Sequence, residues 1–233
     1  MDPLKKARGN IREVFTSVQG EGIHVGVRMT FIRFRGCNLS CNYCDTSDAQ
    51  VMEGPFVHGG KVISNPTSID FLLENVDADI VTLTGGEPLL QTDFAVNLCK
   101  RLRAHGKKNY LDTNATLPDA LNALIEYVDF VSLDFKVPTA TGRPQLWIEH
   151  EECLKIAASK DVFVKLVINE NLLPRELETA CTIIHKVRDT IPLVIQPVFG
   201  EEIPGILEIQ KKALESLQNV RIIPQMHKFL NLE

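Results

Sequence analysis

The sequence predicts an α/β fold, a partial and open TIM-like barrel of about six or seven parallel strands. After residue 28, short apolar runs rich in β-branched residues alternate with helical patterns, which is typical of parallel strands joined by right-handed crossovers. Most of these runs are continuously apolar, as expected for strands that are covered on both faces. A closed barrel normally needs somewhat more than these 233 residues, so we expect a single domain, residues 1–233, with an open barrel.

The elements follow one another in a regular order along the chain. The strand candidates are residues 29–34, 80–84, 109–112, 130–134, 162–168, 193–198 and 220–223. Three helix candidates lie between them. The first covers residues 91–105, the second starts at Pro174, a residue suited to the first turn of a helix, and the third covers residues 206–217. Residues 47–66 contain several glycines and prolines and show no clear period, so we expect a loop there. It either covers the site or forms a surface excursion with a short helix or hairpin.

The composition is that of a globular protein, with 44% hydrophobic and 24% charged residues. The net charge of −5 argues against a surface that coats nucleic acid, and we expect no direct nucleic-acid partner. The first residues carry no apolar run after their charges, and no stretch is apolar over a membrane thickness. We therefore expect no membrane contact and a cytoplasmic location, where disulfides are rare. Cys99, Cys153 and Cys181 fall in helical patterns and are expected to be core or surface thiols.

Three further cysteines lie within eight residues. Cys37, Cys41 and Cys44 have the spacing C-x3-C-x2-C, which lets one loop wrap an iron–sulfur cube with each thiolate on a different iron. Zinc sites usually bring four ligands in two pairs, and no second pair is present. The alternatives are a zinc knuckle completed by a distant histidine, or three buried thiols. The spacing predicts a [4Fe–4S] cluster with one iron open to another ligand.

The distinctive polar residues follow the predicted strands. Because parallel strands bring their carboxyl ends to one edge, these residues are expected to line a single pocket. Besides the cysteines, they are residues 84–88, 112–114, 134–136, Gln196 and 224–228. In the first of these groups, two glycines let the backbone approach a ligand closely, and Glu87 can accept from an ammonium group.

The cysteine spacing, with the aromatic Tyr43 just before the last cysteine, resembles the hallmark of the radical S-adenosylmethionine (SAM) superfamily. The resemblance implies that the open iron binds the amino and carboxylate groups of SAM and that the reduced cluster cleaves it to a 5′-deoxyadenosyl radical. Residues 84–88 resemble the GGE motif of that superfamily, which holds the amino group. Thr113, Lys136 and Gln196 then correspond to the ribose, carboxylate and adenine regions. The complete set implied for SAM is Tyr43, Gly86, Glu87, Thr113, Asp134, Phe135, Lys136 and Gln196.

A narrower resemblance lies upstream. The pattern F-x-S-x-Q-G-E-G, then F-I-R-x-x-G-C-N-L-x-C-x-Y-C-D-T, is similar to the 7-carboxy-7-deazaguanine synthase family, as is the closing Q-M-H-K-F-L. That family contracts the ring of 6-carboxy-5,6,7,8-tetrahydropterin to 7-carboxy-7-deazaguanine and releases ammonia, with magnesium assisting. The adenosyl radical takes the hydrogen from C6 of the pterin, and SAM is regenerated at the end.

This resemblance implies a substrate site to which residues 1–28 contribute. Arg33 would pair with the carboxylate through its planar fork, and Thr46 would be the protein ligand of Mg²⁺, which keeps several waters. The substrate-binding set is Val18, Gln19, Gly20, Glu21, Arg33, Thr84 and His227. The family also implies a homodimer and an electron donor such as flavodoxin or ferredoxin.

Two other functions share part of these features. A glycyl-radical-enzyme activase would use the same cluster on a protein backbone, and its relatives lack the Q-G-E-G segment. A non-catalytic zinc or iron–sulfur module would show no radical chemistry. Turnover of a carboxylated pterin distinguishes the synthase from the activase, and metal analysis distinguishes it from the module.

Overall fold

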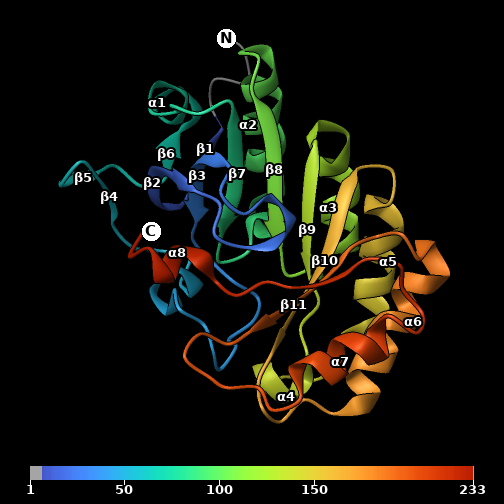
Figure 1. The fold of residues 1–233 in the computed structure, drawn as a ribbon. Helices are drawn as coiled ribbons and strands as arrows, with labels where there is room; N and C mark the ends of the chain where they lie inside the picture. The colour runs from blue at the N-terminus through green and yellow to red at the C-terminus, as the bar shows by residue number, and fades with distance from the viewer. Residues whose placement is uncertain (1–6, 233) are drawn as a thin grey trace.

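The computed structural model describes residues 7–232, and its main feature is one eight-stranded sheet in the order β12-β11-β10-β9-β8-β7-β3-β2 (Figure 1). All seven predicted strands are present and pair in parallel, which confirms the fold class. Within the described residues β2 and β12 remain opposite edges, so the barrel is open. The strands of this sheet are β2 (Ile11–Val18), β3 (Arg28–Phe34), β7 (Ile80–Gly85), β8 (Lys108–Thr113), β9 (Phe130–Asp134), β10 (Asp161–Ile168), β11 (Leu193–Pro197) and β12 (Val220–Ile222).

The eighth strand, β2, was not predicted. It pairs antiparallel with β3, and the register shifts between Ile11 and Glu13. Such a bulge interrupts the alternation of inward and outward side chains, which is the sequence signal of a strand. The shift also lets the consecutive residues Arg12 and Glu13 both reach the cavity described below.

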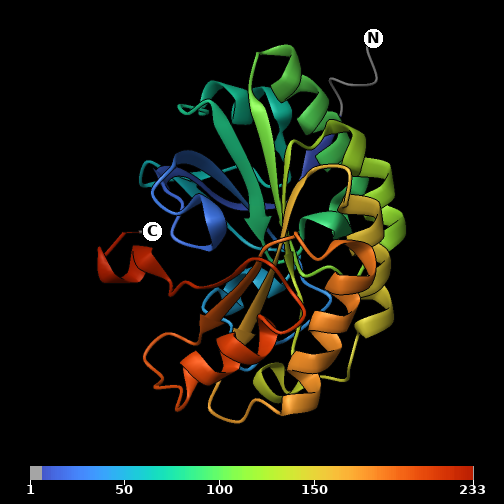
Figure 2. The ribbon, with the colours of Figure 1, turned by 45° about the vertical axis from the view of Figure 1, so that its right-hand side comes forward.

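Helices cover the outer face of the sheet, whereas the carboxyl-terminal segment lies on its opposite side (Figure 2). All three predicted helices are present, as α2, α6 and α7. The predicted bounds of α2 and the predicted start of α6 agree with the structure nearly to the residue. The third helix, α7, ends at Ala213 and not at Leu217, although Leu217 is buried and extends its apolar pattern. The helices are α1 (Ile69–Glu74), α2 (Thr92–Ala104), α3 (Pro118–Leu124), α4 (Pro138–Thr141), α5 (Trp147–Ala157), α6 (Pro174–Arg188), α7 (Ile206–Ala213) and α8 (Met226–Phe229). None of them is both long and apolar enough to cross a membrane.

The two faces of the sheet pack differently. On β10, Val164 and Leu166 point outward into the core beneath the helices, whereas Phe163 and Lys165 point inward. Toward the amino ends of the strands, the interior is filled by an apolar cluster of Met29, Phe31, Tyr110, Phe163 and Val194. This cluster closes the barrel below, so only the carboxyl ends of the strands are left to bind a ligand.

Residues 47–66 form the surface excursion that was one of the two expectations. They contain a 3₁₀ turn (Ser47–Gln50) and an antiparallel hairpin of β4 (Phe56–His58) and β5 (Lys61–Ile63). Only Gln50 of this segment lines the cavity. The carbonyls of Ala49 and Gln50 accept from the amides of Gly36 and Cys37, so the segment supports the cysteine loop from outside. A second small sheet pairs β1 (Arg8–Gly9) with β6 (Thr67–Ser68).

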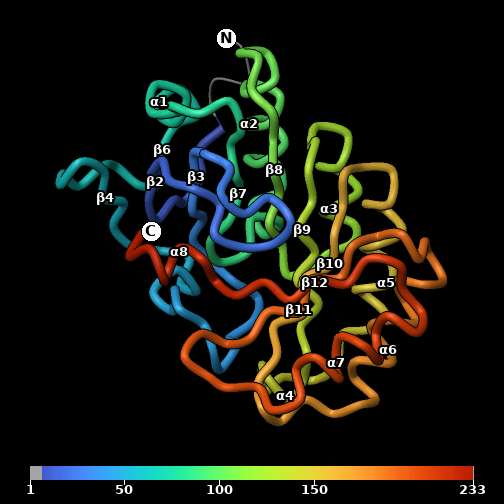
Figure 3. Tube along the Cα trace, viewed as in Figure 1, coloured from blue at the N-terminus to red at the C-terminus, as the bar shows by residue number. Residues whose placement is uncertain are grey.

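The carboxyl-terminal segment leaves β12 and crosses toward the amino-terminal strands (Figure 3). There the amide of Met226 donates to the carbonyl of Gly20 at 2.8 Å. This contact brings the last motif of the chain beside the first one.

Candidate active site

A cavity of about 540 Å³ opens at the carboxyl ends of the strands. Most of the predicted site residues line it, and they come from the cysteine loop, the strand ends and both terminal segments. They are Val18, Gln19, Gly20, Glu21, Arg33, Cys37, Cys41, Tyr43, Cys44, Thr46, Thr84, Gly86, Thr113, Asp134, Lys136, Gln196 and His227. Two predicted residues, Glu87 and Phe135, are not among the residues that line it.

The cysteine loop presents three free thiols to the cavity. Cys37, Cys41 and Cys44 are partly exposed, and burial raises the pKa of the Cys37 and Cys41 thiols. The loop is held by the amide of Asn42, which donates to the carbonyl of Thr141 at 3.1 Å. No three His, Cys, Asp or Glu side chains of residues 7–232 converge closely enough to hold one metal ion. An iron–sulfur cube takes its three thiolates on three separate irons, and three free thiols on one loop fit that donor set.

Glu87 is fully buried behind the cavity, where its carboxylate accepts three hydrogen bonds. Donors are the amide of Leu89, the hydroxyl of Thr113 at 2.8 Å and the amide of Asn114 at 2.7 Å. Burial raises the pKa of Glu87 to about 7, and the three donors only partly offset it. The side chain therefore ties the end of β7 to the end of β8.

Phe135 also turns away from the cavity. Its ring stacks on that of His150 at 4.6 Å, inside the core beneath α5. The imidazole accepts from the amide of Lys136 at 3.2 Å, and burial lowers the pKa of His150 to about 3, which keeps it neutral. Phe135 and His150 thus support the backbone that carries Lys136.

Lys136, Asp134 and Tyr43 form one bonded group on the cysteine side of the cavity. The ammonium of Lys136 donates to Asp134 Oδ2 at 2.8 Å and to the hydroxyl of Tyr43 at 3.1 Å. Burial raises the pKa of Tyr43, so its hydroxyl stays protonated. Gln196 lies on the same inner face, and its Oε1 accepts no hydrogen bond from the described residues.

The Q-G-E-G segment forms the opposite side. The amide of Gln19 donates to the carbonyl of Val27 at 2.7 Å, which closes the turn after β2. A Cβ on Gly20 would lie 2.1 Å from Nδ1 of His227, so any larger residue at position 20 would displace the His227 side chain. Glu21 accepts from Lys165 at 2.6 Å and from Gln225 at 2.7 Å. Burial by itself would raise the pKa of Glu21, but the ammonium of Lys165 outweighs it and lowers that pKa to about 2.

Arg33 faces the cavity from β3 and pairs there with Glu13. Its Nε lies 2.6 Å from Glu13 Oε1, and its guanidinium lies over the ring of Phe15, 5.5 Å from the centroid. Nε makes this contact as an ion pair and donates no hydrogen bond within residues 7–232. Charge and ring contact hold the guanidinium while leaving its planar fork available.

Thr46 follows the cysteine loop, and its hydroxyl lies 3.5 Å from Asp45 Oδ1. Asp45 is itself paired with Lys228 at 2.9 Å. One hydroxyl is a sufficient protein ligand for Mg²⁺ only if water and substrate oxygens complete the octahedron. The polar surroundings of Thr46 fit that arrangement.

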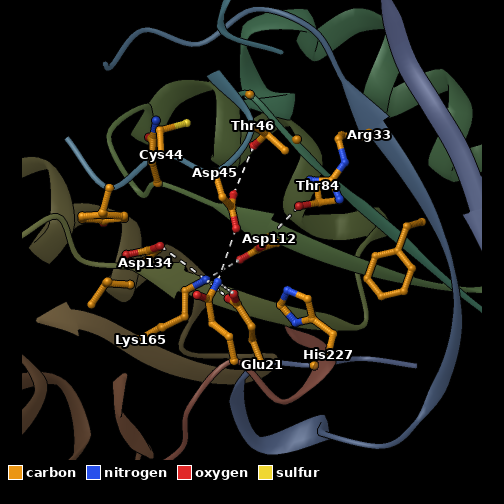
Figure 4. Close-up of a pocket in the computed structure, with 18 of the residues that line it drawn as sticks. Glu21, Arg33, Cys44, Asp45, Thr46, Thr84, Asp112, Asp134, Lys165 and His227 are labelled. Carbon is orange, nitrogen blue, oxygen red and sulfur yellow. Dashed lines mark hydrogen bonds and ion pairs between the residues drawn. The ribbon is translucent and has the colours of Figure 1, made fainter. Parts of the chain in front are cut away.

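Lys165 lines the cavity although the sequence analysis did not select it, whereas Asp112, Asn114 and Gln225 belong to the strand ends that were expected to line the pocket. Lys165 is only 6% exposed and lies close to Glu21, Asp112 and Asp134, as Figure 4 shows. Its signal in the sequence was a single charge at the centre of an apolar strand. A strand with one ionised inward residue is stable only if the interior supplies partners.

Known proteins resemble this chain over nearly its whole length. The family model of the radical SAM superfamily matches residues 31–184. A protein named 7-carboxy-7-deazaguanine synthase from Geobacter sulfurreducens is 37% identical, over 97% of this chain and 99% of that one. One of the same name from Archaeoglobus fulgidus is 32% identical, over 97% and 99%. Among solved structures, QueE from Escherichia coli has a TM-score of 0.64 at 21% identity, covering 94% of this chain and 95% of that one, a likeness in fold.

Proposed function

This chain belongs to the 7-carboxy-7-deazaguanine synthase family of the radical SAM superfamily, and we propose that the cavity at the strand ends is where it performs that family's reaction. The enzyme is a carbon–nitrogen lyase. It contracts 6-carboxy-5,6,7,8-tetrahydropterin to 7-carboxy-7-deazaguanine, with release of ammonia, in the biosynthesis of deazapurine-modified tRNA bases such as queuosine. The activase and zinc-module alternatives are not favoured, because the similarity to the synthases extends over 97% of the chain.

One observation supports this site above the others. The three cysteines, the Q-G-E-G segment, Arg33 and the closing His227 are far apart in the sequence, yet all line one cavity. The enzyme uses a [4Fe–4S] cluster, SAM and Mg²⁺. Bound together, the cluster and SAM supply the radical that starts the ring contraction.

The cysteine side of the cavity is the proposed SAM subsite. Its cation, Lys136, is oriented by Asp134 and Tyr43 and is suited to a carboxylate. Gln196 has a buried oxygen without a donor, which suits the amino group of an adenine. Thr113 would lie near the ribose. Glu87 takes a supporting part, because its carboxylate is already occupied by the chain's own donors.

The opposite side is the proposed pterin subsite. The free fork of Arg33 suits the substrate carboxylate, and Glu21 stays ionised and so only accepts from the N–H groups of the pterin edge. Gln19, the backbone at Val18 and Gly20, Thr84 and His227 complete the wall. We place Mg²⁺ at Thr46, between the two subsites.

Three properties of the assembly remain part of the proposal. The enzyme works as a homodimer, receives single electrons from a small donor such as flavodoxin or ferredoxin, and is cytoplasmic. These expectations come from the family and from the reducing chemistry that a cluster of this kind needs.

Anaerobic turnover tests the function directly. The protein is reconstituted with iron and sulfide, reduced, and given SAM, Mg²⁺ and 6-carboxytetrahydropterin, and the deazapurine is sought by mass. Cys41→Ala is the control, expected to lose both cluster absorbance and product. Formation of 5′-deoxyadenosine without deazapurine would support the radical chemistry and contradict the assignment of the pterin as substrate. Absence of both from a well-loaded cluster would contradict the family reaction.

A further inference from the structure

The ammonium group of Lys165 lies between carboxylates from three parts of the chain. Lys165 Nζ is 2.6 Å from Glu21 Oε2, 3.3 Å from Asp134 Oδ2 and 3.7 Å from Asp112 Oδ1. Figure 4 shows the three carboxylates directed at it from different strands and from the loop after β2. No other lysine or arginine of the described residues pairs with Glu21 or Asp112.

Burying this ammonium group has a cost in folding free energy. The Lys165 side chain is 6% exposed, and burying an ammonium is unfavourable without ionic partners. Around it lie three carboxylates and one further cation, Lys136, which pairs with Asp134 at 2.8 Å. His227 also faces Glu21, and burial lowers the pKa of that imidazole. Removing the charge of Lys165 would leave the buried Asp134 and the partly buried Glu21 and Asp112 facing one ammonium.

The ammonium of Lys165 lies between the two proposed subsites, and this position indicates its role. Glu21 belongs to the proposed pterin subsite, and Asp134 belongs to the proposed SAM subsite through Lys136. Lys165 and Asp134 are register partners on the neighbouring strands β10 and β9, whereas Glu21 lies in the loop after β2, which also packs on β10 through Gly22 and His24. Lys165 thus joins a loop residue to a rigid strand pair.

We propose that Lys165 is a positioning residue that fixes the pterin subsite against the SAM subsite by holding Glu21 and Asp134 on one ammonium. The inference rests on the proposed function, because it takes the two subsites from there. Radical transfer requires the two ligands to lie within contact of each other, so a link between their walls affects the reaction and not only the stability of the barrel.

Loss of the charge has a defined consequence for Glu21. With Lys165 present, its positive charge outweighs the effect of burial on the pKa of Glu21, so the carboxylate is ionised throughout the neutral range. Without it, Glu21 keeps only Gln225 as a hydrogen-bond donor and faces Asp112 and Asp134. Both burial and the like charges then raise its pKa, so Glu21 binds a proton as the pH falls.

The test uses Lys165→Met in the reconstituted holoenzyme. We expect the Michaelis constant (KM) for the pterin to rise about tenfold or more, because a hydrogen bond to a charged group is lost. We also expect the two enzymes to differ in their pH profiles. As the pH falls below neutral, kcat/KM should stay constant in the unmodified enzyme and decrease in the variant. Calorimetric binding to the holoenzyme should show SAM and pterin both weakened. Lys155→Met, an exposed lysine on α5, is the matched control and should behave as the unmodified enzyme.

A double variant separates positioning from general damage. In a Glu21→Gln background, Lys165→Met should raise the pterin KM much less, because the group through which it acts is gone. An equal effect in both backgrounds, a flat pH profile, or weakening of only one ligand would each overturn the inference. If Lys165→Met fails to load its cluster, Lys165→Gln is put through the same measurements and judged by the same outcomes. Absence of deazapurine from the unmodified enzyme refutes the proposed function instead, and the binding data still decide the inference.

Discussion

At the scale of single residues, the environment and not the residue type sets the charge state. Glu21 and Glu87 are glutamates at the same end of the barrel, yet their pKa values lie near 2 and 7. The ammonium of Lys165 stabilises the ionised form of Glu21, whereas Glu87 has only neutral donors against the cost of burial. One carboxylate can therefore recognise a ligand, and the other holds the backbone.

Arg33→Ala is the sharpest test at this scale. We expect the pterin KM to rise about ten- to hundredfold, the cost of a lost charged hydrogen-bonding pair, while cluster absorbance is unchanged. Arg101→Ala is the control, because Arg101 lies on α2 outside the cavity and is paired with Asp70 at 2.8 Å. It should change the KM much less. A pterin KM that stays the same in Arg33→Ala would remove Arg33 from the substrate site.

At the scale of elements, the site depends on loops that approach each other without room for a side chain. A Cβ on Gly86 would lie 2.0 Å from the carbonyl oxygen of Gly36, in the loop that begins the cysteine motif. A Cβ on Gly20 would instead meet the ring of His227. The first contact joins the end of β7 to the cysteine loop, and the second joins the loop after β2 to α8.

Alanine at the two positions should therefore have different effects. Gly86→Ala must displace backbone, so we expect a lower cluster content and a melting temperature lower by about 2–12 °C, as an overpacking cost of about 1–3 kcal/mol implies. Gly20→Ala should keep the cluster and lose pterin affinity, because a movable side chain gives way. Iron content, melting curves and pterin KM measure the difference. Equal cluster loss in both variants would contradict this division of roles.

At the scale of the whole molecule, the open barrel is completed by its last residues. The strands β2 and β12 lie at opposite edges, and the segment after β12 crosses the space between them. It is tied to the opposite side by Gln225 on Glu21 and Lys228 on Asp45. No residue of α8 is buried, so this segment adds wall to the cavity and little to the core.

Truncation after Ile223 tests this reading. We expect the shortened chain to fold, bind its cluster and cleave SAM, because the core and the cysteine loop are intact. The pterin KM should rise more than about tenfold, since Glu21 loses a hydrogen bond and the cavity loses His227. Circular dichroism, cluster absorbance and the two product assays measure these effects, with the exposed Leu230→Ala as control. Unchanged pterin turnover would show that the segment is dispensable.

The sequence by itself determined the strand pattern, the edge that holds the site and a set of site residues of which all but Glu87 and Phe135 line the cavity. These features depend on local signals. Parallel strands show themselves as apolar runs, their carboxyl ends share an edge by topology, and the cysteine motif lies within eight residues. For the same reason the helices with a clear apolar face, such as α2 and α6, were found close to their true bounds.

Only the tertiary structure decided which side chains face each other across the barrel. β2 was missed because its bulge breaks the alternation and its partner β3 supplies the pairing. Phe135 and Glu87 turn away from the cavity, toward the core and the backbone, although their motifs predicted contact with the ligand. Lys165 has no motif at all. Its partners lie at positions 21, 112 and 134, so their convergence arises from the packing of strands and not from any spacing along the chain.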